Sequence, residues 1–236
     1  MGFKLLPIIA MVGFTTFTGI AGAENPFVDP HIPHGERITY ATRVGDKSIT
    51  VLESVSIIKD GDTDCYEITS LSENLDRTIR LQKNSMSTLA VHTVRKFQEV
   101  TLDSQLTVIN EKQHFIDGEV KLADFAILNY LFRGFPFGKI KTLKIGYYGE
   151  ERSKKYTFSA QCKKNEKLTV NQKTIECYKI EFGMDGFWGN LLPKTKVWYS
   201  VESPHYLVRY EGPSGPPGSP KRTIELISYE IMEEHR

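Results

Sequence analysis

The sequence LADFAILNYLFRGFPFG, residues 122–138, decides how the rest of this chain folds. Its apolar side chains are interrupted only by Asp124 and Asn129 before Arg133. Placed on a helix at about 100° per residue, they surround the cylinder instead of forming one stripe. A helix that is apolar on nearly all sides is normally buried on nearly all sides. The stretch therefore predicts one buried helix at about 122–133, ended by the glycine and proline that follow it.

The residues on both sides of this helix show the alternation of β-strands. Tyr156, Phe158 and Ala160 alternate with polar residues, as do Val197 and Tyr199. A period of two indicates half-buried strands, and turn residues separate the runs. We therefore expect a mainly β protein with one central helix: a strongly curved antiparallel sheet forms a half-open barrel over the helix. A two-sheet sandwich with a lid helix is the alternative.

Composition limits the classes of partner. The chain has 236 residues, of which 40% are hydrophobic and 25% charged, and its formal net charge is +1. Such a balanced chain has no global basic field with which to hold nucleic acid. The length left after an N-terminal leader suits one domain, residues 24–236.

Residues 1–23 have the pattern of a secretory signal peptide. Lys4 precedes a largely apolar run from Leu5 to Ile20, and Ala21-Gly22-Ala23 is a small-residue cleavage site. We expect cleavage before Glu24 and export to the periplasm. The alternative is a membrane anchor, but the run is short and interrupted by a proline, a glycine and threonines.

Three cysteines, Cys65, Cys162 and Cys177, follow the leader. An exported chain permits disulfides. Cys162 and Cys177 fall on strands that could be neighbours, which makes them a disulfide candidate. The alternative is that all three are small buried thiols. No C-x-x-C motif is present, so neither a thioredoxin-type nor a zinc-ribbon site is indicated.

Catalytic and metal signals are weak. Asp29, His31, His34 and Glu36 form D-x-H-x-x-H-x-E, but neither a helix nor a strand would bring this spacing to one point. We expect residues 24–34 to be an exposed lead-in without a metal. The sequence carries no G-x-S-x-G, S-x-x-K or H-E-x-x-H motif and no phosphate-binding glycine loop. It assigns no catalytic residue and no cofactor.

The connection at residues 182–192 is unusually apolar. Phe187 and Trp188 lie in it, among three glycines. Because connections are normally polar, such a segment either packs into the core or forms the rim of a cavity or a membrane contact.

Six segments, taken in order, resemble a known family. They are GERITY at 35–40, LFRGFPFG at 131–138, EKLTVNQKTIECYKIE at 166–181, KVWYS at 196–200, YLVRYEG at 206–212 and TIELI at 223–227. Together they resemble the bacterial periplasmic domain-of-unknown-function family numbered 3108. Its architecture is similar to that of lipoprotein-carrier proteins, a half-open barrel with a helix over an apolar cavity. The resemblance implies this fold and suggests a lipophilic ligand, and it supplies no catalytic residues. The early Pro204 and the long 212–220 loop depart from the family pattern.

These observations predict a non-enzymatic periplasmic carrier or binding protein for a lipid, an acyl chain or a lipoprotein segment. The predicted lining residues are Phe125, Leu128, Leu131, Phe132, Phe187 and Trp188. Asp124 and Arg133 are expected to position the helix. An envelope adaptor that acts by strand addition to a partner protein is the alternative, and it would have a filled interior and a long unpaired edge. A hydrolase is a third class, which would need a polar cleft with paired carboxylates or a histidine beside a serine or cysteine.

Overall fold

The computed structural model describes residues 26–97, 100–107, 119–122, 124–148, 155–186, 189, 192–215 and 218–232. The expected signal peptide, its cleavage site, Phe187 and Trp188 lie outside these ranges. The strands are β1 (Glu36–Val44), β2 (Lys47–Asp60), β3 (Thr63–Ser72), β4 (Leu75–Gln82), β5 (Thr88–Phe97), β6 (Val100–Thr107), β7 (Glu119–Leu122), β8 (Thr142–Tyr148), β9 (Lys155–Cys162), β10 (Glu166–Val170), β11 (Lys173–Met184), β12 (Thr195–Ser200), β13 (Leu207–Pro213) and β14 (Lys221–Ile231). One helical segment, residues 125–134, joins η1 (Phe125–Ile127), α1 (Leu128–Leu131) and η2 (Phe132–Gly134).

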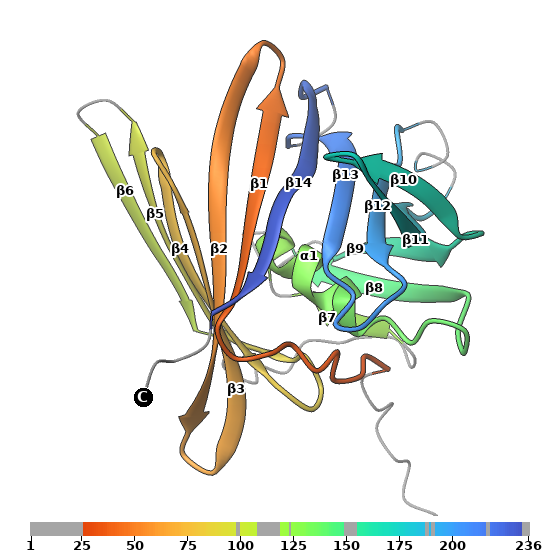
Figure 1. The fold of residues 1–236 in the computed structure, drawn as a ribbon. Helices are drawn as coiled ribbons and strands as arrows, with labels where there is room; N and C mark the ends of the chain where they lie inside the picture. Colours follow the sequence, from red (N-terminus) through yellow and green to blue (C-terminus); the bar gives the residue numbers. More distant parts are fainter. Residues whose placement is uncertain are drawn as a thin grey trace, which may run out of the picture.

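The strands form one large curved sheet that does not close. Its order is β6-β5-β4-β3-β2-β1-β14-β13-β12-β11-β9-β8-β7, with β10 paired to β11 beside this path. All pairings are antiparallel except that of β7 with β8. Figure 1 shows two wings that splay apart around the helical segment. We call β2–β6 the first wing and β7–β9 with β11–β13 the second wing. The predicted fold class, a curved antiparallel sheet around one helix, is confirmed.

The helical segment is shorter than the sequence predicted. Leu122 ends β7, and the helix begins at Phe125, not at 122. Asp124 has extended backbone angles, and its carboxylate accepts a hydrogen bond from the Ala126 N–H at 2.7 Å, which caps the first turn. At the other end Phe135 is extended, as expected for a residue before a proline.

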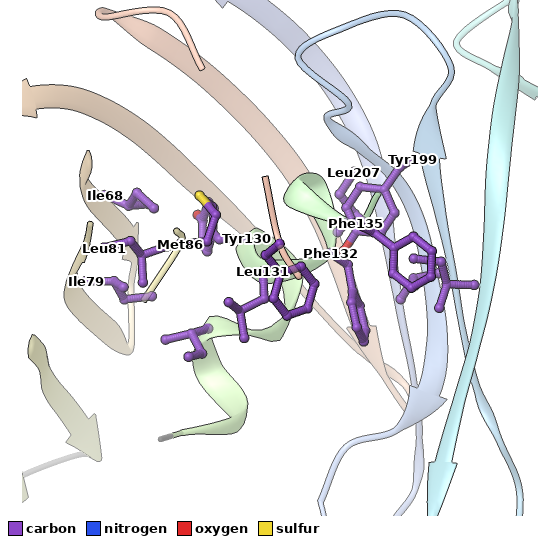
Figure 2. Close-up of a cluster of buried hydrophobic side chains, with 14 of the residues drawn as sticks. Ile68, Ile79, Leu81, Met86, Tyr130, Leu131, Phe132, Phe135, Tyr199 and Leu207 are labelled. Atoms are coloured by element: carbon purple, nitrogen blue, oxygen red, sulfur yellow. The ribbon is translucent and has the colours of Figure 1, made fainter. Parts of the chain in front are cut away.

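The segment is buried on nearly all sides, as its composition predicted. Ile127, Tyr130, Leu131 and Phe132 are at most 4% exposed. They belong to a single core cluster that both wings share. Figure 2 shows Ile68, Ile79 and Leu81 of the first wing on one side of Tyr130 and Leu131, and Phe135, Tyr199 and Leu207 on the other. The helix therefore fills the space between the wings with side chains.

The prediction that residues 24–34 form an exposed lead-in is wrong for the described part of that segment. Phe27 and Ile32 are buried in the core, and the Val28 N–H donates to the Gly134 carbonyl at 2.9 Å. The Ile32 N–H donates to the Tyr66 hydroxyl at 3.1 Å. Three prolines prevented a periodic pattern, but they did not prevent the apolar residues between them from closing the core beside the end of the helix.

The candidate disulfide between Cys162 and Cys177 is not formed, and both thiols are free. Cys162 lies opposite Ile180 in the β9–β11 pairing, so its side chain is on the same face as Ile180. Cys177 is three residues from Ile180 along β11, so it is on the other face. It packs there with Trp198 and Val208 in a separate small cluster. The strands are neighbours, as expected, but the sheet itself separates the two sulfur atoms.

Candidate functional site

A buried ion pair fixes the helical segment to the sheet. Arg133 is 2% exposed and Glu36, at the start of β1, is fully buried. The Arg133 Nη1 and Nη2 atoms donate to the two carboxylate oxygens of Glu36 at 2.6 and 2.8 Å, and Nε donates to the Pro204 carbonyl at 3.2 Å. Burial lowers the pKa of Arg133, but the Glu36 carboxylate more than offsets this, so the pKa lies above its usual value. The pair is fully engaged in positioning the helix, the role expected for Arg133.

The opposite end of the helix carries an exposed aromatic side chain. Phe125 is 42% exposed, although its ring contacts three aromatic rings of the second wing. The ring centroids of Tyr147 and Phe158 lie 4.7 and 5.3 Å away in edge-on geometry, and that of Phe182 lies 6.4 Å away. Phe158 and Phe182 stack on each other at 5.1 Å. We call Phe125, Tyr147, Phe158 and Phe182 the aromatic patch.

The structure divides the predicted lining residues. Phe125 is exposed and Leu128 is half-buried, whereas Leu131 and Phe132 are closed off in the core. Phe132 contacts the patch from the core side, since its ring centroid lies 5.7 Å from that of Phe182. The remaining two predicted residues, Phe187 and Trp188, lie outside the described part of the chain. Of the six predicted lining residues, the structure therefore places Phe125 on the aromatic patch.

Polar side chains form a row across the inner face of the first wing, the face that carries Ile68 and Ile79. The row follows the strand register from β2 to β6 and consists of Glu53, Ser70, Arg77, Thr93 and Ser104. We call it the polar row. The Ser70 hydroxyl donates to Glu53 at 3.3 Å, and the Arg77 Nε donates to the Thr93 hydroxyl at 3.2 Å. An inner face with charged residues beside a continuous core is unusual.

Tyr130 of α1 lies over this row. Its hydroxyl is buried and makes no hydrogen bond within the described residues. Burial raises the pKa of Tyr130, and the nearby Glu53 carboxylate raises it further. Burial also raises the pKa of Glu53, partly offset by the hydroxyls of Tyr130 and Ser70 and by Arg133. The sequence analysis missed this cluster because each strand contributes only one residue to it. The signal that the sequence offered was a polar residue at an inward-facing position of each strand.

Two surface hollows of the described chain are polar. One, of about 360 Å³, is lined by Glu67, Thr78, Arg80, Ala90 and His92. The other, of about 50 Å³, is lined by Ser159, Gln161, Glu181, Gly183, Met184, Asp185 and Lys194. Both lie on outer faces, because their lining residues alternate with buried ones such as Ile79 and Ile180. Neither hollow provides an apolar cavity.

The histidine and carboxylate motif near residue 30 is used for structure. Asp29 accepts a hydrogen bond from the Tyr66 hydroxyl, and His34 Nδ1 accepts one from the Ile57 N–H at 3.0 Å. Glu36 pairs with Arg133. Within the described residues no group of three such side chains could hold a metal ion.

Comparisons with known proteins give structural neighbours only. No protein-family model matches the chain, so the resemblance to family 3108 stays a prediction, and no curated protein matches either. A β-barrel-like protein of domain of unknown function DUF1849 from Brucella abortus is 6% identical with a TM-score of 0.43, and the match covers 84% of this chain and 98% of that one. The hypothetical lipoprotein YmcC from Escherichia coli is 13% identical with a TM-score of 0.34, covering 85% and 92%. An exported protein with a YmcC-like fold from Bacteroides fragilis is 11% identical with a TM-score of 0.34, covering 86% and 98%. At such identities and scores no function transfers to this chain.

None of the helices in the described ranges has the length and apolar character needed to cross a bilayer.

Proposed function

We propose that this protein is an exported, non-enzymatic protein of the periplasm that binds the hydrocarbon part of a lipophilic ligand, such as a lipid, an acyl chain or a lipoprotein segment. The observation that carries this proposal is the aromatic patch. Phe125 keeps 42% of its surface exposed at the start of a helical segment in which Ile127 and Tyr130 are buried.

The binding mode follows from the filled core. Because Leu131 and Phe132 are closed off by core contacts, the ligand's chain lies on the patch and does not enter a preformed cavity. Each methylene that the patch removes from water contributes about 0.8 kcal/mol before ordering costs are subtracted. A chain of several methylenes therefore gives measurable affinity on a surface of this size.

The test uses the fluorescent apolar probe N-phenyl-1-naphthylamine. The wild-type protein is expected to bind it saturably. Phe125→Ser should weaken binding by about tenfold, since a lost aromatic contact is worth about 1.4 kcal/mol. Leu52→Ser is the matched control, because Leu52 is also an exposed apolar residue (39%) but lies on the outer face of β2.

Absence of saturable probe binding, or an equal loss in both variants, would contradict the proposal. Lipid extraction followed by mass spectrometry of protein purified from the periplasm adds an independent measurement. A lipid that co-purifies with the wild type and not with Phe125→Ser identifies the ligand class.

The open end of the sheet favours a second candidate, an adaptor that pairs with a partner protein by strand addition. Within the described ranges β6 pairs with β5 alone, and residues 101–104 are exposed. An unpaired strand edge can accept a further strand. A photo-crosslinking side chain at Thr101 would then give a defined adduct in intact cells, and the same group at Thr50, within the sheet, would not. Adducts at neither position would remove this candidate.

A further inference from the structure

Two arginines lie on neighbouring strands of the inner face of the first wing. Arg77 on β4 lies opposite Thr93, and Arg95 on β5 lies two residues further along the same face, opposite Leu75. They are diagonal cross-strand neighbours, whose Cα atoms are typically about 7–8 Å apart. Neither forms an ion pair with a carboxylate of the described residues, unlike Arg80, which pairs with Glu67 at 2.8 Å on the outer face.

Their surroundings make this arrangement electrostatically costly. Burial lowers the pKa of Arg77, and Arg95 lowers it further, while Asp124, Tyr130 and Glu53 act in the opposite direction. The Arg77 Nε bonds the Thr93 hydroxyl, which leaves its Nη groups for another acceptor. Two neighbouring guanidinium groups repel each other, and a bound anion would relieve that repulsion.

Two buried hydroxyls, one on α1 and one on β3, lie at this inner face without a hydrogen bond to the described residues. The Tyr130 hydroxyl, in a side chain that is 4% exposed, is buried without a hydrogen bond and lies near Glu53 and Ser70 of the polar row. The Ser72 hydroxyl, also buried without a partner, lies opposite Leu75, which in turn lies opposite Arg95. A buried hydroxyl that makes no hydrogen bond costs about 1–3 kcal/mol, so a pair of them beside two arginines without an ion pair among the described residues favours a further polar group at this place.

The start of the helix connects this region to the aromatic patch. Asp124 lies close enough to Arg77 to raise its pKa, and the next residue along the chain, Phe125, lies on the aromatic patch. A ligand that spans the first residues of the helix would therefore meet cationic groups on the first wing and aromatic rings on the second.

We propose that Arg77 and Arg95 bind the anionic headgroup, a carboxylate or phosphate, of the ligand whose hydrocarbon lies on the aromatic patch. Tyr130 donates a further hydrogen bond to that headgroup. This inference rests on the proposed function and names its ligand class as an anionic amphiphile.

The experiment compares two amphiphiles of equal chain length, dodecanoate and dodecyl maltoside, as competitors of N-phenyl-1-naphthylamine below their micelle concentrations. Wild-type protein is expected to bind dodecanoate more tightly. Arg77→Gln and Arg95→Gln should each weaken dodecanoate binding by about tenfold, as expected for a charged hydrogen bond, and leave dodecyl maltoside unchanged. Arg43→Gln, an exposed arginine on the outer face of β1, is the matched control and should change neither.

Arg95 is exposed, so its replacement does not endanger folding. Tyr130→Phe provides a second, more specific readout. It removes the buried hydroxyl, so dodecanoate binding should weaken while dodecyl maltoside binding stays unchanged. A purely structural role of this hydroxyl would instead lower stability and leave the preference for dodecanoate intact.

Equal binding of both amphiphiles by the wild type, unaffected by Arg77→Gln and Arg95→Gln, would overturn the headgroup assignment while the proposed function stands. Calorimetric titration with inorganic phosphate separates the sources of the anion: phosphate binding that Arg95→Gln abolishes, without a preference for dodecanoate, would overturn the amphiphile assignment. If neither amphiphile displaces the probe, the proposed function fails, and this inference fails with it.

Discussion

Arg133 and Glu36 lie 97 residues apart in the sequence and form a bidentate, fully buried ion pair. Such a pair gains little over apolar side chains of similar volume, because both charges lose their hydration. The pair instead defines the position of the helix end, because the bidentate hydrogen bonds fix the orientation of the guanidinium against the carboxylate. The helix end is thereby tied to β1 and, through Pro204, to the loop before β13.

Replacing only one member of this pair should therefore be much more harmful than replacing both. Arg133→Leu leaves the Glu36 carboxylate buried and unpaired, and we expect it to lower the free energy of unfolding by about 3–5 kcal/mol. The double variant Glu36→Leu with Arg133→Leu should recover most of this loss. Urea unfolding of the wild type, Arg133→Leu, Glu36→Leu and the double variant measures the loss and its recovery. A single variant that costs less than about 1 kcal/mol would show that the pair is solvated.

Glu53 should make stability depend on pH in a predictable direction. Burial raises its pKa above the ordinary value of 4.5, so the folded state binds the proton more readily than the unfolded chain. Above pH 4.5 the buried, ionised Glu53 carboxylate therefore lowers the free energy of unfolding. This loss disappears as the pH falls below 4.5, where Glu53 becomes protonated in the folded and the unfolded protein alike. Glu53→Gln should unfold at higher urea concentration than the wild type at pH 8, and this advantage should shrink towards pH 4.5. A constant difference between the two proteins across this range would be inconsistent with a raised pKa.

At the scale of the element, the helical segment is held at its C-terminal end by a contact that only a glycine permits. Gly134 ends η2, and its carbonyl accepts from the Val28 N–H. A Cβ atom at this position would lie 2.5 Å from the Val28 carbonyl oxygen and 3.0 Å from the Met86 Cγ. The glycine is thus required by the close approach of the lead-in.

Gly134→Ala should accordingly destabilise the fold by about 1–3 kcal/mol, the usual effect of overpacking a core. Gly183→Ala is the control. Its nearest neighbour would be the Lys194 Cγ at 3.2 Å, in a flexible side chain that can move away. Urea midpoints compare the two, and equal losses would mean that the lead-in does not pack against the helix as described.

At the scale of the whole molecule, one continuous core joins both wings, and no covalent cross-link contributes to it. Burial raises the pKa of Cys177 to about 12, with Glu166 and Glu176 adding to the effect, and burial raises that of Cys162 as well. Both thiols are therefore poor nucleophiles at neutral pH.

The unfolding midpoint of the purified protein should thus be the same with and without dithiothreitol. Alkylation after denaturation should modify all three cysteines, with mass spectrometry as the readout. A midpoint that falls on reduction would show that at least one disulfide forms in solution, contrary to the three free thiols of the structure.

The sequence alone determined the local features of this protein. Alternating residues predicted strands, and the dense apolar run predicted one buried helical segment that includes Leu128, Leu131 and Phe132. These features depend on backbone periodicity and on steric limits near glycine and proline, which act over a few residues. Phe125 was identified for the same reason, since it belongs to that run.

Only the tertiary structure decided the features that depend on long-range packing, which are the strand register and the face on which each side chain lies. The register between strands placed Cys162 and Cys177 on opposite faces, and it aligned Glu53, Arg77 and Arg95 on one inner face. Each of these residues is an ordinary polar or small residue within its own strand. Their relations arise from which strands pair and in what register, and that is determined by burial of the whole core rather than by any short segment.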